Sequence, residues 1–418
     1  MRAKNCSKFI ESLHLVFTAF RTIHLTRPTI SANNTQNDSA NISCLFSVIS
    51  VGCRAEHKNA ECAEVTKDGK LEDKKGLGYF QMLESNQQLK VPSYSLAAQL
   101  WARVQQLLKV RELNVFIALL VVGALISMFT PYFLTTNNLM GVFRSFSMTA
   151  IMSIGMVMVI ITGGIDLSVG SAMGLSSLVT ALCFSFGLPT GVCIAAGLAV
   201  GLVFGTVNGL LITGIGLPPF IATLGTLSIG RGLMYIITHG VPLTPDIPES
   251  FSVLGQGYLG FVPVPVIIMI VMVIVFSILM TKTRFGRHVY ATGGNETAAR
   301  LSGVKTNGVK MAVYVASSTI AALAGVISFS RYLSAEPASG FGAELDVIAA
   351  AAIGGASLSG GVGSVGGAVI GAALAGIIAN GVVLMNINTY AQQAITGAVI
   401  LIAVSMDVLR TNNRGGRG

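Results

Sequence analysis

The chain has 418 residues, of which 52% are hydrophobic and 11% charged, and its mean hydropathy is +0.71. Water-soluble domains carry about 25% charged residues, so this composition excludes an ordinary soluble protein and favours a helical bundle in a lipid bilayer. The net charge of +9 does not indicate a nucleic-acid partner, because the basic residues are not gathered with aromatic residues on one face. They gather in loops, where membrane proteins carry their basic residues on the cytoplasmic side.

The first part of the chain differs from the rest. Residues 1–90 are polar and show no sustained period of 2 or 3.6, so we expect a disordered or artefactual N-terminal extension. One hypothesis is that translation starts at Met82. In residues 91–112, apolar residues return at helical spacing beside Trp101 and several basic residues. This pattern predicts an interfacial helix on the anionic cytoplasmic surface, with an ordinary polar lead-in to the first span as the alternative.

Residues 113–410 hold the predicted transmembrane domain, because a bilayer core of about 30 Å needs roughly 20 apolar residues for each helical span. The predicted spans are 114–130, 148–163, 167–186, 189–214, 218–238, 263–281, 311–330, 346–358, 363–384 and 391–409. Several of them are short and one contains Arg231, so tilted, broken or re-entrant segments are expected. We predict an all-α, polytopic transmembrane helical bundle of eight to ten spans, with ten favoured.

The distribution of charge predicts how the bundle is oriented. If 91–112 lies inside, six crossings return the chain to the cytoplasm at Thr281. The loop from there to Lys310 holds six Lys or Arg residues and the single acid Glu296. Ten crossings also place the basic tail, 411–418, inside. An even count therefore satisfies the positive-inside rule at three places and puts both termini in the cytoplasm.

Glycine recurs at every fourth position of one predicted span, at Gly197, Gly201, Gly205 and Gly209. Residues at this spacing form one smooth ridge on a helix, along which a neighbouring backbone can approach closely. The ridge predicts tight helix packing, and lining of a pathway is the alternative.

The string GGIDLSVG, at 163–170, places the acid Asp166 among apolar spans, where a buried charge is costly unless it is paired or hydrogen-bonded. Two interpretations are open. Asp166 caps the following helix by accepting from the amides near Val169, or it contacts the translocation path together with Ser168. A similar string, GGASLSGG at 354–361, hints at an internal repeat.

The basic loop contains the signals of a short surface helix. Gly293 and Gly294 predict a turn, Asn295 an N-cap with Glu296 in the positive first turn, and Ala299 and Arg300 a helix that ends at Gly303. A capped helix in a cytoplasmic loop suits a membrane subunit that presents itself to a soluble motor. A solvated loop helix without a partner is the alternative.

The sequence lacks the motifs of an ATPase and of the common hydrolytic enzymes. It has no GxxxxGK[ST] phosphate loop, so ATP binding by that route is excluded. It also has no HExxH pair and no nucleophile elbow, so we predict no catalytic residues, metal or cofactor and do not expect an enzyme.

Four segments together resemble the permease subunits of bacterial ribose-type sugar ABC importers, in the branched-chain amino acid/ribose permease superfamily. They are GMVMVIITGGIDLSVGSAMGL, PPFIATLGTLSIGRGL, TRFGRHVYATGGNETAARLSGV and GAELDVIAAAAIGGASLSGGVGSVGGAVIG. The resemblance runs from about Arg111 to Arg410. It implies a type II-like importer permease in the bacterial inner membrane that translocates a monosaccharide. A stand-alone sugar facilitator or secondary carrier is the alternative.

The resemblance also implies protein partners besides the lipid bilayer. They are a cytoplasmic ATP-binding subunit, a periplasmic sugar-binding protein and a second permease copy, either identical or a paralogue. By this similarity the segment from Gly293 to Gly303 docks the ATPase. Glu344 and Asp346 belong to a family-like motif, for which we expect ion pairing with Arg331.

Overall fold

The computed structural model describes residues 111–388 together with 394, 397, 398 and 405. The predicted extension over 1–90, all but the end of the predicted interfacial helix, the tail over 411–418 and most of the last predicted span, 391–409, lie outside these residues. Within the described part the fold is all-α apart from a hairpin of β1 (Tyr258–Leu259) and β2 (Val262–Pro263).

The described helices follow one another with short connections. They are α5 (Arg111–Phe129), α6 (Thr136–Ile161), α7 (Val169–Ser185), α8 (Thr190–Leu210) with the π-helical turn η1 (Leu211–Ile215), α9 (Pro219–Thr238), α10 (Glu249–Gln256), α11 (Val264–Lys282), α12 (Arg284–Gly294), α13 (Glu296–Leu301), α14 (Thr306–Tyr332), α15 (Ala343–Ile353) and α16 (Val365–Leu384). Seven of these, α5, α6, α8 with η1, α9, α11, α14 and α16, are long and apolar enough to cross a membrane, and α7 is apolar but shorter. The total of ten spans stays a prediction.

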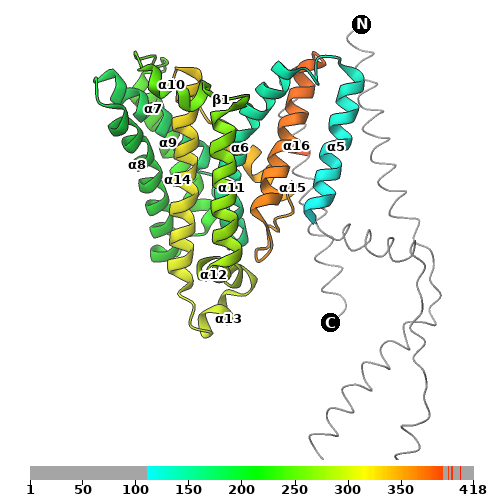
Figure 1. The fold of residues 1–418 in the computed structure, drawn as a ribbon. Helices are drawn as coiled ribbons and strands as arrows, with labels where there is room; N and C mark the ends of the chain where they lie inside the picture. The colour runs from blue at the N-terminus through cyan, green and yellow to red at the C-terminus, as the bar shows by residue number, and fades with distance from the viewer. Residues whose placement is uncertain (1–110, 389–393, 395–396, 399–404, 406–418) are drawn as a thin grey trace, which may run out of the picture. The chain divides into compact units, whose positions relative to one another are not determined.

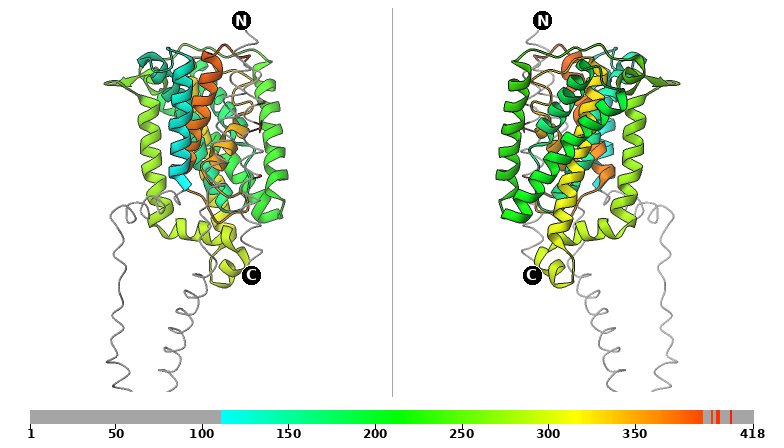
Figure 2. Two further views of the ribbon diagram at one scale, coloured as in Figure 1. Left: turned by 90° about the vertical axis from the view of Figure 1, so that its right-hand side faces the viewer. Right: turned by 90° about the vertical axis from the view of Figure 1, so that its left-hand side faces the viewer.

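The long helices run side by side (Figure 1), with α10 and the hairpin at one end of the bundle and α12 and α13 at the other. Figure 2 shows α12 lying across this second end, which we call the α13 end. The core is centred on α6 and α14, whose side chains Ile151, Ile154 and Phe329 are fully buried. The outer helices expose large apolar residues, such as Leu202 of α8 and Ile236 of α9, as expected for helices that face lipid.

The glycine ridge of α8 lies against α14. A Cβ atom on Gly201 would meet the backbone of Ser318, and one on Gly205 would meet the backbone of Val315. Since no side chain stands between the helices, their backbones approach closely, which is the use that membrane helices commonly make of glycine. In this conformation α14 covers the ridge.

Helix α6 begins at Thr136, twelve residues before the predicted span at 148. The polar residues of its first turns hide this start from a hydropathy reading. Other elements satisfy them: Asn138 exchanges hydrogen bonds of 3.0 and 2.9 Å with Asn380. Arg144 donates to the Gln256 carbonyl at 3.2 Å and stacks over the Tyr258 ring.

Two helices begin inside the bundle rather than at its ends. Helix α7 follows the non-helical residues 162–168, and α15 follows residues 333–342. The break before α15 touches the first turn of α7, because a Cβ atom on Gly340 would meet the carbonyl of Gly170. With eleven residues, α15 is about 16 Å long, too short for a full crossing.

Candidate functional site

Helix α13 is a fixed element at its end of the bundle. Asn295 is its N-cap, as predicted, and its side chain accepts from the Ala298 amide at 2.9 Å. The Glu296 carboxylate accepts from Lys310 at 2.7 Å and from Arg300 at 3.2 Å. The pKa of Glu296 lies below its ordinary value because Lys310 donates to the carboxylate. The bond from Lys310 ties α13 to the first turns of α14.

The predicted turn at Gly293 and Gly294 is wrong, because both residues are the last two of α12. This helix starts after Thr283, whose hydroxyl caps it by accepting from the Gly286 amide at 3.3 Å. Glycine is needed at Gly293 for close contact and not for a turn, since a Cβ atom there would meet the Ile161 carbonyl oxygen. The segment is therefore a corner of two helices joined at Asn295.

Glycines from three parts of the chain meet at the end of α12. We call Gly163, Gly293, Gly360 and Gly361 the glycine junction. The Gly361 amide donates to the Ile161 carbonyl at 2.8 Å, and a Cβ atom on Gly360 would meet both Gly293 and Gly163. Through this junction, α12 touches the break after α6 and the loop between α15 and α16.

The two similar strings, 163–170 and 354–361, both reach the junction, and each begins where a helix ends. The left-handed φ falls on the first glycine of one string, Gly163 at 81°, and on the second of the other, Gly355 at 91°. Each of these glycines is the second residue after the end of its helix, α6 at Ile161 and α15 at Ile353. In both strings this glycine amide donates to the carbonyl three residues before it, as at many helix ends. The helix stop therefore recurs, offset by one position between the two strings.

Asp166 is fully buried. Its Oδ1 atom accepts from the Ser168 amide at 3.0 Å and from the Ser168 hydroxyl at 2.6 Å, and its Oδ2 atom accepts from the Ser317 hydroxyl at 3.2 Å. Among the amides near Val169, the carboxylate accepts from that of Ser168, which is itself the N-cap residue of α7. The carboxylate shapes the turn before the helix.

A chain of donors extends from this carboxylate into two further helices. The Asn208 side-chain amide of α8 donates to the Ser168 hydroxyl at 2.8 Å, and the Thr226 hydroxyl of α9 donates to Asn208 Oδ1 at 2.7 Å. The five side chains of this network are all buried: Asp166, Ser168, Asn208, Thr226 and Ser317 of α14. Hydrogen-bonded chains of this kind are strong in a low dielectric, so the network joins the break before α7 to α8, α9 and α14.

The sequence reading missed Asn208, Thr226 and Ser317. The signal that could have found them is polarity at buried positions of apolar helices, since such groups need partners. Asn208 in particular is a buried polar residue of α8 and directly precedes Gly209, the last glycine of the ridge.

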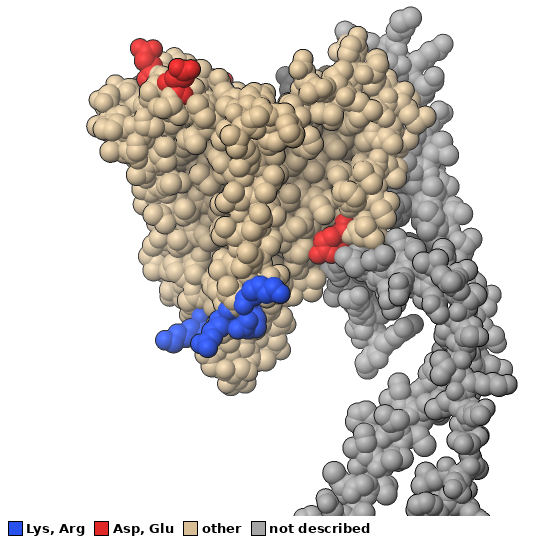
Figure 3. Space-filling model, viewed as in Figure 1, with Lys and Arg blue, Asp and Glu red and all other residues tan. Residues whose placement is uncertain are grey.

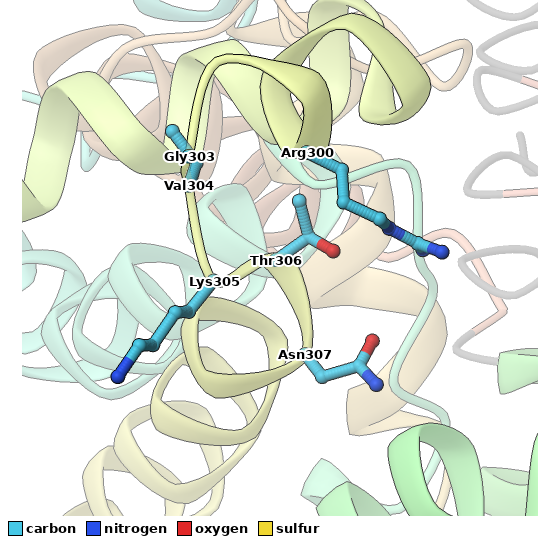
Figure 4. A pocket seen from close by; sticks show the side chains of 6 residues that line it. All are labelled: Arg300, Gly303, Val304, Lys305, Thr306 and Asn307. Carbon is cyan, nitrogen blue, oxygen red and sulfur yellow. The ribbon is translucent and has the colours of Figure 1, made fainter.

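The surface of the α13 end is basic. Figure 3 shows Lys and Arg gathered there, whereas acids lie at the opposite end and on the lower right-hand side of the view. Between α13 and α14 lies a hollow lined by Arg300, Gly303, Val304, Lys305, Thr306 and Asn307. In Figure 4 the Arg300 and Lys305 side chains extend to opposite sides of it. This end of the bundle therefore offers a capped helix, a hollow and basic side chains on one face.

A bundle of apolar helices in which two helices start inside is found in many membrane transport proteins. The chain belongs to the family described as the branched-chain amino acid transport system permease component, which matches residues 138–404. It is a membrane permease.

Curated relatives carry the likeness over most of their length. The ribose import permease RbsC of Escherichia coli K12 is 40% identical over 299 residues, which are 71% of this chain and 93% of the relative. RbsC of Bacillus subtilis 168 is 41% identical, covering 71% and 92%. The D-allose permease AlsC of E. coli K12 is 37% identical, covering 70% and 90%. No solved structure matches the chain.

Proposed function

We propose that this chain is the membrane-spanning permease subunit of an ATP-binding cassette importer that moves a monosaccharide across the bacterial inner membrane. The relatives named for ribose and D-allose support the substrate class. The glycine junction is the observation that carries the mechanism, because it brings the surface segment α12–α13 into backbone contact with the break before α7 and with the loop between α15 and α16.

The α13 end lies in the cytoplasm in this proposal, with both termini, because membrane proteins keep basic loops on that side. An ATP-binding subunit docks on α13 and supplies the ATP hydrolysis. A sugar-binding protein docks at the opposite end, and a second permease copy completes the transporter. Whether that copy is identical or a paralogue does not alter the role of α13.

The chain performs no chemistry of its own in this scheme. Closure of the ATP-binding subunits displaces α13, and its bonds to Lys310 and Arg300 make the displacement that of a fixed helix rather than of a loose loop. Gly293 passes the displacement to Ile161 and Gly361, because no side chain is present to absorb it. The break before α7 and the loop between α15 and α16 then change position.

The alternative is a stand-alone facilitator or secondary carrier, and partner capture separates the two. A tagged copy of the chain, purified from native membranes in mild detergent, is expected to bring down a protein with the GxxxxGK[ST] loop that this chain lacks. Deletion of 296–301 should abolish that capture while the chain still inserts. A wild-type chain that purifies without any ATP-binding protein, in membranes that import the sugar, would contradict the proposal.

Replacing both Glu296 and Arg300 by Ala is expected to uncouple the importer. Sugar uptake should fall at least about tenfold while ATP hydrolysis continues. The fold should persist, since ion pairs with exposed partners contribute only about 0–1 kcal/mol, and Arg300 is largely exposed. Lys282→Ala, an exposed change at the same end, is the control. Normal uptake by the double variant would argue against the coupling role.

A further inference from the structure

A pair of opposite charges lies inside the bundle. Arg231 Nη2 is 3.5 Å from Glu344 Oε2, and each side chain is 14% exposed. With a rise of 1.5 Å per residue, Arg231 lies about 18 Å from the start of α9 and about 10 Å from its end. Charged groups within spans are rare and usually mark a pathway. Glu344 therefore pairs with Arg231, not with Arg331 as the sequence led us to expect.

The pair is held in a defined shape. Arg231 Nη1 donates to the Ser339 carbonyl at 2.9 Å, and Nη2 donates to the Gly340 carbonyl at 2.6 Å. These bonds fix the loop before α15 against α9. Among the described residues, the Nε–H of Arg231 and the Oε1 atom of Glu344 have no hydrogen-bond partner. The pair thus leaves one donor and one acceptor unpaired.

An aromatic ring completes the group. Phe341 is 75% exposed, and the Arg231 guanidinium lies 5.3 Å from its ring centroid. A monosaccharide offers an apolar C–H face and adjacent hydroxyls. The negative face of an aromatic ring attracts the C–H groups, while a planar guanidinium and a carboxylate donate to and accept from the hydroxyls.

The group also stands where the two internal helix starts meet. A Cβ atom on Gly170, in the first turn of α7, would meet both Glu344 and the Gly340 carbonyl. In many transporters the substrate site lies between helices that are broken near the middle of the membrane. Helix α15 begins next to Glu344, and the loop that follows it contains Gly360 and Gly361 of the glycine junction. Helix α7 begins a few residues after Gly163, which also belongs to the junction. Motion at the junction therefore reaches this group through two short helices.

We propose that Arg231, Phe341 and Glu344 hold the monosaccharide as it passes through the permease. This inference rests on the proposed function and names the contact site that the function requires. It assigns the contact to this group rather than to Asp166, whose side chain is fully buried and already accepts three hydrogen bonds.

The first test pairs one side chain with one sugar hydroxyl. Vesicles contain the chain, its ATP-binding subunit and its sugar-binding protein. The probes are whichever of D-ribose, D-allose and L-arabinose the wild type imports, with its monodeoxy analogues. In wild type, loss of the hydroxyl that Glu344 binds should lower uptake about tenfold or more, as for hydrogen bonds to charged groups. In Glu344→Gln the same loss should have little effect.

The binding protein is the same in both cases, so its own preference cancels in the comparison. Glu336→Gln, the same change at an exposed acid in the loop before α15, should keep the wild-type ratios. Unchanged ratios in Glu344→Gln would overturn the site and leave the importer intact. No ATP-dependent uptake of any of the three sugars by wild type would instead count against the proposed function.

A second measurement does not require the variant to transport. In a background without the six native cysteines, Phe341→Cys should react with a water-soluble thiol reagent, and the imported sugar should slow the reaction. Leu202→Cys, at an exposed position of α8, should stay unreactive in lipid. An unreactive Phe341→Cys, or a reaction that the sugar does not slow, would overturn the site.

Discussion

Replacing Gly293 by Ala should reduce ATP-driven uptake at least about tenfold. The added Cβ atom would meet the Ile161 carbonyl oxygen and the Gly361 amide. Both are backbone atoms, which cannot turn aside as a side chain does, so the end of α12 must separate from the end of α6 and from the loop between α15 and α16. Overpacking of this kind costs about 1–3 kcal/mol, and its main effect falls on the contact that passes motion from α13 into the bundle.

Gly294 provides the matched control, because a Cβ atom there would meet nothing. Both substitutions raise helix propensity by the same amount, about 1 kcal/mol, so they differ only in the contact. Uptake, ATP hydrolysis and the amount of chain in the membrane should be measured together. The account requires that Gly294→Ala imports normally and that Gly293→Ala hydrolyses ATP with little import. Equal import by the two variants would contradict it.

Replacing Asp166 by Ala should destabilise the bundle strongly, whereas Asn should be milder. Alanine leaves the Ser168 amide, the Ser168 hydroxyl and the Ser317 hydroxyl buried without their acceptor. Each unsatisfied buried group costs about 1–3 kcal/mol. Asparagine keeps an oxygen for Ser168, and its amide can donate to Ser317 once that hydroxyl rotates.

Thermal unfolding of the purified variants in detergent, followed by uptake, measures this difference. Asp246→Ala removes an exposed acid and should leave the unfolding temperature unchanged. If Asn proves as harmful to stability as Ala, the carboxylate does more than accept these bonds, and the network described for Asp166 is insufficient. If Asn is stable but fails in transport, the negative charge itself is needed on the path.

The sequence predicted the features that depend on local signals. Apolar composition predicted a membrane bundle, and Asn295 followed by Glu296 predicted α13 with its cap. These signals lie within a few residues of the element that they specify, so no tertiary contact is needed to interpret them. The glycines at every fourth position of α8 likewise identified a packing face of this helix, although not the helix that covers it.

Long-range pairing was beyond the sequence. Glu344 meets Arg231, 113 residues away, whereas the expected partner Arg331 was near in sequence and stacks instead on Tyr332. Gly293 was interpreted as a turn because glycine commonly forms turns, yet its absent side chain serves a contact with Ile161. The partner of a contact residue depends on the fold, which no local pattern specifies.

Sugar accumulation in reconstituted vesicles tests the central claim most directly. Vesicles holding this chain, its ATP-binding subunit and its sugar-binding protein should accumulate the sugar against a gradient only when ATP reaches the α13 end. Vesicles that lack either partner should take up none. If the chain alone equilibrates the sugar across the membrane, or accumulates it on an ion gradient without ATP, it is a carrier and not the permease subunit of an importer.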